Sequence, residues 1–330
     1  MTISVIIITR DERPRLRLCL TSLARQTVDW QRDAELIIVD DGSIPAVGAA
    51  EIPASLPTPR VIRHERSRGR SAARNAGAGL ASGDRLLFLD GDVLLSPEAS
   101  ARHAGLGPNE LGRGEQRHLR GTRFFRDPRS GEPWPGKESL VRSLGDLSSR
   151  LVTEQMIEQL PFERWVERSE AAIYPGAAPR RLYELEMSAL RARSAPYAEW
   201  MAAAGHNFSV PRVAFEDVGG FNEEVSLNEH RELALRMCRR GARVRAVEGA
   251  ISIHITHREG WRDPLATDDG WQTVFARHHP LETQVLLRFW RSLAADRSIA
   301  PGERVLTLEA ADALLRQRTR PDGPWPPTAG

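Results

Sequence analysis

The chain has 330 residues, of which 27% are charged and 41% hydrophobic, and its 46 basic residues nearly balance 44 acidic ones. This length is enough for about two domains or one large α/β unit, and it excludes a peptide hormone, a fibre, a disulfide miniprotein and a disordered chain. With a formal net charge of +2 and no Lys/Arg block, the chain is not expected to bind nucleic acid.

The two cysteines and the apolar segments indicate where the protein resides. Cys19 and Cys238 lie far apart without a CxxC motif, which suits a reducing cytosol. The N-terminus carries no basic stretch followed by a long apolar run, so we expect no signal peptide. Arginines interrupt the apolar stretch 285–293, which is shorter than the roughly 20 residues of a transmembrane helix. We therefore expect a soluble, cytoplasmic protein.

The first hundred residues alternate strand-like apolar runs with amphipathic helical segments, a pattern that predicts a parallel sheet covered by helices. The predicted strands cover residues 3–8, 35–39, 60–63 and 85–89. Helices are predicted around Leu16, Leu20 and Leu23 and over residues 71–81. Because ligands of open α/β sheets gather at the carboxyl ends of the strands, the polar residues that follow these strands are candidate site residues.

The rest of the chain is less regular. Residues 105–136 are rich in Gly, Pro and Arg, so we expect a loop-rich insert there. Helical periodicity returns over residues 137–168 and 179–195, where prolines break any long element. Further elements are predicted as strands over 206–210 and 244–254, a helical turn over 212–218, and helices over 229–240, 281–295 and 305–318, before a frayed tail.

Five short motifs occur in a fixed order along the chain. They are SVIIITR at residues 4–10, VDDGS at 39–43, GRSAARNAG at 69–77, LDGD at 89–92 and VGGFNE at 218–223. In this order they resemble the family 2 glycosyltransferases, which use nucleotide-sugar donors. The resemblance covers roughly residues 1–98 and 200–258, and residues 99–199 are matched only by position.

This resemblance implies an α/β fold of the GT-A class, which is Rossmann-like, with a mostly parallel central sheet flanked by helices. Residues 1–98 would form the nucleotide-sugar-binding half and residues 200–258 the second half. Residues 99–199 would be a variable helical and loop-rich insert that sets acceptor specificity, and residues 259–330 a C-terminal helical extension.

Asp90, Gly91 and Asp92 match the DXD motif of the family. Two carboxylates two residues apart, with a glycine that permits a tight turn, can present oxygens to one divalent cation that bridges a diphosphate. Such a cation assists departure of the nucleoside diphosphate. The resemblance implies that Asp92 is the direct metal ligand and that Asp90 and Gly91 lie against the nucleotide sugar. An ordinary Asp-Gly turn is the alternative interpretation.

Other residues near the strand ends resemble the nucleotide-sugar pocket. Asp40 or Asp41 would accept hydrogen bonds from a nucleobase N–H or a ribose hydroxyl, and Thr9 and Arg10 would form the other wall. Further contacts come from elsewhere in the chain. Arg70 and Arg74, four residues apart on the predicted helix, would meet the diphosphate. Asn207 would contact the donor sugar.

The second half is expected to supply a general base. Family members often carry Glu-Asp followed by Glu-Leu, whereas this chain has Glu229 and His230 followed by Arg231, Glu232 and Leu233. Three interpretations stay open: Glu229 is the base, which we prefer; His230 has taken the role; or the reaction uses no such base. A carboxylate at a helix start is also favoured by the helix dipole alone.

His254 and His257 lie near the end of the last predicted strand. Several GT-A enzymes use a late histidine as a further metal ligand, so the resemblance implies that one of them binds the cation. A neutral imidazole suits Mn²⁺ better than Mg²⁺. A hydrogen-bonded structural histidine is the alternative for either residue.

Taken together, these features predict a metal-dependent glycosyltransferase that transfers a sugar from a nucleoside-diphosphate donor, UDP first, to a small or diffusible acceptor with inversion. A homodimer is compatible with the sequence. Two other classes stay open. One is a non-catalytic nucleotide-binding scaffold of the same fold, and the other is a nucleotidyltransferase, although the N-terminal segment has no lysine for a phosphate loop.

Overall fold

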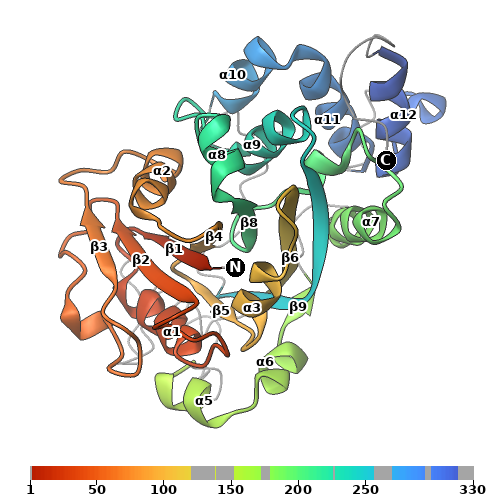
Figure 1. Ribbon diagram of the computed structural model, residues 1–330. Coiled ribbons are helices and arrows are strands. Elements are labelled where there is room, and N and C mark those ends of the chain that lie inside the picture. Colours follow the sequence, from red (N-terminus) through yellow and green to blue (C-terminus); the bar gives the residue numbers. More distant parts are fainter. Residues whose placement is uncertain are drawn as a thin grey trace.

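The computed structural model describes residues 2–119, 138, 152–171, 179–225, 227–255, 270–293 and 299–318. Within these parts, nine strands form one mixed sheet in the order β3-β2-β1-β4-β8-β6-β9-β5, with β7 paired to β6, and helices cover the sheet (Figure 1). The chain therefore has the mixed α/β fold that the sequence predicts.

The N-terminal half follows the predicted alternation of strands and helices. Its elements are β1 (Ile3–Thr9), α1 (Arg13–Leu23), β2 (Ala34–Asp40), the short helix η1 (Ala49–Glu51), β3 (Arg60–Arg63), α2 (Arg70–Leu80) and β4 (Arg85–Asp90). The strands β3, β2, β1 and β4 are parallel to one another, whereas β4 is antiparallel to its other neighbour, β8. All four strands and both helices expected in this segment are confirmed.

Alternating residues of β1 pack into two separate cores. Ile6 and Ile8 join the cluster that contains Ala73 of α2, whereas Val5 and Ile7 join the cluster that contains Leu16 of α1. Successive side chains of a strand point to opposite faces. The continuous apolar run of β1 is thus explained by a strand that is buried on both faces.

The second half begins with β5 (Val93–Leu95), α3 (Ala99–Ala104) and β6 (Glu110–Leu119). It continues with α5 (Glu154–Gln159), α6 (Phe162–Arg168), β7 (Glu170–Ala171), α7 (Pro179–Ala192), η4 (Glu199–Ala202), β8 (Phe208–Pro211), α8 (Arg212–Asp217), α9 (Glu229–Cys238) and β9 (Arg243–Ile255). The C-terminal elements are α10 (Trp271–His278), α11 (Pro280–Leu293), η5 (Pro301–Glu303) and α12 (Leu308–Arg318).

The expectation of a loop over residues 105–136 is wrong for residues 110–119, which form β6 between β8 and β9. The glycines that suggested a loop are places of close approach. A Cβ on Gly114 would lie 2.1 Å from Asn207 Nδ2, and one on Gly112 would lie 2.5 Å from Ser209 Oγ. Glycine in a strand often marks such contacts. Residues 120–136 lie outside the described part of the chain.

Smaller differences concern the helices. The periodic segment 137–168 contains two short helices, α5 and α6, which are separated at Leu160 and Pro161. Proline has no N–H and fits only the first turn of a helix, so the second helix begins after Pro161. Helix α10 lies within residues 259–330, the segment expected to form a C-terminal helical extension, but no separate range was predicted for it. Residues 139–151 and the expected frayed tail lie outside the described residues.

Cys19 and Cys238 are both buried and free. Burial raises the pKa of both thiols. In the part of the chain that the structure describes, no helix has the length and apolar character needed to cross a bilayer.

Two glycines of α2 provide a test of the packing between this helix and the sheet. A Cβ on Gly77 would lie 2.5 Å from Ile6 Cγ2, whereas a Cβ on Gly79 would meet nothing within 4 Å. We expect Gly77→Ala to destabilise the protein by about 1–3 kcal/mol and Gly79→Ala to stabilise it by up to about 1 kcal/mol. Urea denaturation measures both. Equal effects of the two substitutions would contradict this packing.

Candidate active site

The carboxyl ends of the parallel strands bring the predicted site residues together at one edge of the sheet. Thr9 lies opposite Asp40 in the β1–β2 register, and Ile8 lies opposite Asp90 in the β1–β4 register. The turn after β4 is tight, since a Cβ on Gly91 would lie 3.2 Å from Thr9 Oγ1. Arg10 is exposed just beyond β1, where it forms a 3.5 Å ion pair with Asp11.

Asp92 and His254 come together through the pairing of β5 with β9. These strands are antiparallel, with Val93 opposite His254, and the Ile255 N–H donates to the Asp92 carbonyl oxygen at 2.8 Å. The pairing places Asp92 Oδ2 3.2 Å from His254 Nε2. Burial lowers the pKa of His254, but the carboxylates of Asp92, Asp90 and Glu12 together more than offset this, so the net pKa is raised.

Two further histidines, His118 and His206, lie beside His254, and sequence reasoning did not select them. Their ring centroids lie 5.1 and 5.7 Å from the His254 ring. His118 faces His254 directly in the β6–β9 register, a pairing that depends on the unpredicted strand β6. Burial lowers the pKa of His206 to about 4, so this ring is neutral at pH 7.

These residues offer few protein ligands to a divalent cation. Among the described residues, no group of three or more His, Cys, Asp or Glu side chains is arranged to hold a metal ion. Asp92 and His254 nevertheless offer one carboxylate oxygen and one imidazole nitrogen, a donor pair that suits Mn²⁺ when diphosphate and water oxygens complete the coordination. His257 lies outside the described residues.

Arg74 connects the DXD motif to the second half of the chain. Its side chain is 1% exposed, and its guanidinium lies 2.8 Å from Asp90 Oδ1 and 2.6 Å from Glu229 Oε1. A buried arginine that binds two carboxylates fixes their relative position. Asp90 and Glu229 are therefore held in one cluster, although they are far apart in sequence.

Arg70 differs from Arg74, although the two are one turn apart on α2. It is exposed and has no hydrogen bond or ion pair with any residue that the structure describes. Desolvation lowers its pKa, but the carboxylates of Glu229, Asp90 and Asp92 raise it above the ordinary value. Of the two predicted diphosphate contacts, Arg70 is therefore the one whose guanidinium is available to a ligand.

Glu229 and His230 begin helix α9, and both are buried. His230 Nδ1 lies 3.5 Å from Glu229 Oε1, and the ring meets Phe208 and Phe221 edge-on at centroid distances of 6.1 and 5.6 Å. Burial, followed by the positive charge of Arg74, lowers the pKa of His230 well below the ordinary value. This imidazole is neutral and a weak base.

Asp40 and Asp41 are both buried and accept hydrogen bonds from the protein. Asp40 accepts from the Ser43 and Val47 N–H groups and from Arg63. Asp41 accepts from the side chains of His64 and Ser67 and from the backbone N–H groups of Arg68 and Gly69. Burial raises the pKa of both carboxyl groups, but these donors lower it below the ordinary value. Both aspartates shape the loops after β2 and β3, and their contact with a nucleotide stays a prediction.

Asn207 is fully buried, and its amide joins four elements of the fold. It accepts from the His103 ring at 2.9 Å and donates to the carbonyl oxygens of Glu115 and Ala250. These bonds give Asn207 a structural position between α3, β6, β8 and β9. Its predicted contact with a donor sugar is untested.

His103, which donates to Asn207, makes the stability of the fold sensitive to acid. Burial lowers the pKa of His103 to about 4, whereas an unfolded histidine titrates near 6.5. Because the unfolded chain binds the proton more readily, the stabilisation is fully present above pH 6.5 and is lost as the pH falls toward 4. Between pH 7.5 and 4.5 we expect wild type to lose about 2–3 kcal/mol more stability than His103→Gln, as measured by urea denaturation. Parallel losses would contradict this.

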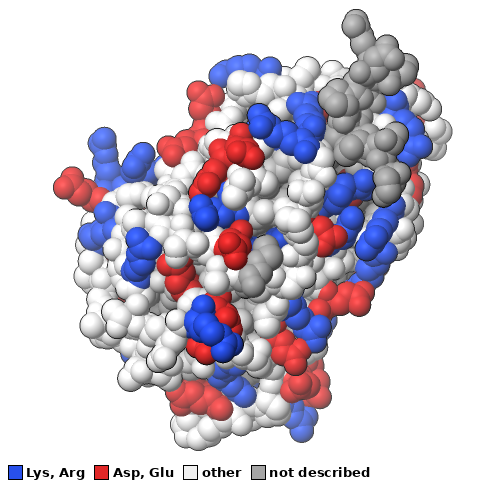
Figure 2. Space-filling model, in the orientation of Figure 1, with Lys and Arg blue, Asp and Glu red and all other residues white. Residues whose placement is uncertain are grey.

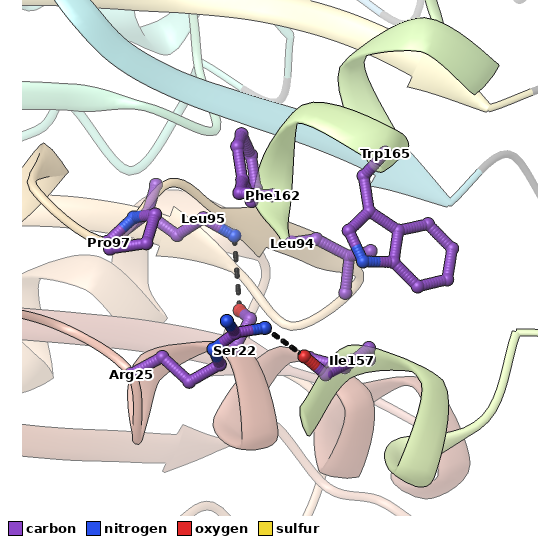
Figure 3. Close-up of a pocket in the computed structure, with 8 residues that line it drawn as sticks. All are labelled: Ser22, Arg25, Leu94, Leu95, Pro97, Ile157, Phe162 and Trp165. Carbon is purple, nitrogen blue, oxygen red and sulfur yellow. Dashed lines mark hydrogen bonds between the residues drawn. The ribbon is translucent and has the colours of Figure 1, made fainter. Parts of the chain in front are cut away.

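Two pockets lie apart from this cluster. Figure 3 shows the smaller, of about 10 Å³, where Arg25 donates to the Ile157 carbonyl oxygen, and its lining is mostly apolar. This volume holds at most one water molecule. The larger pocket, of about 410 Å³, lies by α8, α9 and α10. Its buried Glu232 is bonded to Arg236 and His279, so these side chains stabilise the fold.

Acidic and basic side chains are mixed on the face of the molecule that Figure 2 presents, without one field of a single sign. A nucleic-acid-binding face would gather Lys and Arg side chains.

Comparisons with known proteins agree with this architecture. Residues 4–105 match the model of Glycosyl transferase family 2. The chain is 26% identical over 288 residues to a pre-mycofactocin glycosyltransferase of Mycobacterium tuberculosis, covering 86% of this chain and 50% of that protein. It is 30% identical over 230 residues to a validoxylamine A glucosyltransferase of Streptomyces hygroscopicus subsp. jinggangensis, covering 68% of this chain and 48% of that protein. The chain thus spans about half the length of these curated relatives.

Two solved structures have a similar fold. TarS residues 1–349 from S. aureus, in complex with UDP, aligns with a TM-score of 0.52 at 15% identity, covering 90% of this chain and 73% of that chain. GalNAc-T7 with UDP, GalNAc and Mn²⁺ aligns with a TM-score of 0.53 at 16% identity, covering 96% of this chain and 54% of that chain. The fold is that of the GT-A glycosyltransferases.

The matched segment contains four of the five motifs, and it confirms the family that these four indicate. Residues 4–105 belong to glycosyl transferase family 2.

Proposed function

We propose that the protein is a glycosyltransferase that moves a sugar from a nucleoside-diphosphate donor to a hydroxyl or amine of an acceptor. The observation that carries this proposal is the convergence of Asp90, Asp92, Glu229 and His254 at one edge of the sheet, from both halves of the chain. The family 2 match over residues 4–105 and the names of the relatives support the same activity.

A divalent cation is part of the proposal. Asp92 and His254 would hold it, and when bound it neutralises charge on the diphosphate leaving group. The 3.2 Å separation of Asp92 Oδ2 and His254 Nε2 supports this placement. A solved structure of similar fold contains UDP and Mn²⁺, which makes these the first nucleotide and metal to test.

The chain's own residues have distinct roles in the proposed reaction. Arg70, exposed beside the carboxylates, binds the diphosphate. Arg74 holds Asp90 and Glu229 in place from within the protein. Binding donor and acceptor in one orientation supplies much of the rate enhancement in such reactions.

Glu229 is the base that we propose for the acceptor hydroxyl. It accepts the proton as the hydroxyl oxygen attacks the anomeric carbon, and a single in-line displacement of this kind inverts the configuration. His230 is less suited because burial lowers its pKa well below the ordinary value and its ring packs on Phe208 and Phe221.

The acceptor is proposed to be a discrete, diffusible molecule. The names of the two relatives, a pre-mycofactocin glycosyltransferase and a validoxylamine A glucosyltransferase, each give one acceptor and support this class. Location in the cytoplasm and assembly as a homodimer stay predictions.

Release of nucleoside diphosphate from a panel of nucleotide sugars tests the activity. We expect one donor to be turned over with Mn²⁺ by wild type and not by Asp92→Asn. Asp84→Asn is the matched control, because Asp84 lies just before β4, where it accepts from Thr2. We expect this variant to turn over donor at the wild-type rate. Binding of a nucleotide without turnover of any donor would contradict the enzyme and favour the scaffold.

A further inference from the structure

A buried group of three charged side chains lies between β6, α7 and α9. Glu186 of α7 is fully buried, with Oε2 3.2 Å from the guanidinium of Arg113 and Oε1 3.0 Å from that of Arg231. One carboxylate thus bridges two arginines. Breaking such a buried ion pair leaves an uncompensated charge, so the three side chains hold one arrangement.

Both arginines are fixed by further contacts. Arg113 donates to the Ala202 carbonyl oxygen at 2.6 Å, and Arg231 donates to the Met201 carbonyl oxygen at 2.7 Å. The Arg231 guanidinium also lies over the Trp290 ring, 5.1 Å from its centroid. The Arg231 side chain therefore cannot move without losing several of these contacts.

Arg231 also reaches the residue that precedes Glu229. Its NH1 donates to Asn228 Oδ1 at 3.1 Å, and Asn228 has the left-handed backbone conformation, with φ of 62°. Asparagine adopts this conformation more readily than most residues with a Cβ, and the bond from Arg231 fixes its side chain there. The next residue, Glu229, pairs with Arg74 at 2.6 Å. The backbone turn at Asn228 thus determines the direction in which the Glu229 side chain leaves the backbone.

We propose that Glu186 is a positioning residue for Glu229. It holds Arg231, Arg231 holds the left-handed turn at Asn228, and this turn directs Glu229 toward Arg74. The proposal rests on the proposed function, in which Glu229 is the base. Helix α7 lies outside residues 4–105, so a segment beyond the family match would set the geometry of the reacting group.

Steady-state kinetics of Glu186→Gln test this role. We expect kcat to fall by about 100-fold, since a small misplacement of a reacting group has effects of this size, whereas KM for the donor stays within about threefold. Glu282→Gln is the control, because Glu282 is a buried carboxylate that pairs with Arg239 at the other end of α9. This control is expected to lose stability but not kcat. Equal kcat losses in the two variants would overturn the proposal.

A second variant leaves the charged group intact and so avoids the risk of unfolding. Glycine adopts a positive φ without strain, and Asn228→Gly removes only the side chain that Arg231 holds. If Glu186 acts through Asn228, the double variant Glu186→Gln/Asn228→Gly has a kcat no lower than the slower single variant. If the reduction in kcat of the double variant equals the product of the two single reductions, the effects are independent and Glu186 does not act through Asn228.

Melting temperatures of the same two single variants and the double variant distinguish failure of this proposal from failure of the proposed function. Absence of turnover in wild type would refute the function. The shifts of the two single variants and the double variant would still decide the link between Glu186 and Asn228. Non-additive shifts support it, and additive shifts overturn it.

Discussion

Arg74→Met is expected to destabilise the protein by about 3–5 kcal/mol, because it removes the cation from two carboxylates in a buried cluster. Arg74 is 1% exposed, and it pairs with Asp90 at 2.8 Å and with Glu229 at 2.6 Å. Without it, the Glu229 carboxylate stays buried without a compensating charge at that position. The measurement is the free energy of unfolding from urea denaturation.

Two further variants make the Arg74 result specific. Arg191→Met removes an exposed arginine that pairs with Glu248 at 3.1 Å, and it should cost at most about 1 kcal/mol. Combining Arg74→Met with Glu229→Gln should recover part of the lost stability, since one stranded charge is then neutral. A loss below about 1 kcal/mol for Arg74→Met would mean that this cluster does not hold the two halves together.

Asp92→Asn is expected to lower the rate of sugar transfer by at least about 1,000-fold, the scale of several kcal/mol in the transition state. An amide oxygen carries no charge and binds a divalent cation more weakly than a carboxylate. Chelation of divalent cations with EDTA should reduce the wild-type rate by a similar factor, and added Mn²⁺ should restore it. Turnover is followed as nucleoside diphosphate released.

The Asp92 prediction also has a structural control. The β5–β9 pairing is carried by the backbone, including the 2.8 Å bond from the Ile255 N–H to the Asp92 carbonyl oxygen, so Asp92→Asn should keep its fold. Its circular dichroism and melting curve should resemble those of wild type. A variant that folds and turns over donor at the wild-type rate would remove Asp92 from the proposed mechanism.

The sequence predicts the N-terminal half well because its signals are local. The apolar strands, such as Ile3–Thr9, are buried on both faces of the sheet and end at polar residues. This pattern places Asp90 at the carboxyl edge of the sheet. The second half was harder to predict. Strand β6 carries two glycines and buried Arg113, whose partner Glu186 is distant in sequence, so no local pattern marks it as a strand.

The sequence selects candidate site residues by type and says little about their contacts. Asp92 and His254 lie 3.2 Å apart, and their role as metal ligands stays a prediction. The sequence did not separate exposed Arg70 from buried Arg74. Arg74 is buried where it meets Glu229 of α9, and the four-residue spacing on one helix does not indicate such a contact. His118 was missed for the same reason, since it reaches His254 only through the pairing of β6 with β9.

The central claim is that Asp92 and His254 form, with a cation, the site at which a nucleoside diphosphate binds. Isothermal titration calorimetry with UDP, GDP, CDP, ADP and dTDP tests it most directly, in Mn²⁺ and in EDTA, on wild type and Asp92→Asn. We predict that one nucleotide binds wild type only with Mn²⁺ and does not bind Asp92→Asn. Equal binding in EDTA, or equal binding to the variant, would contradict the claim.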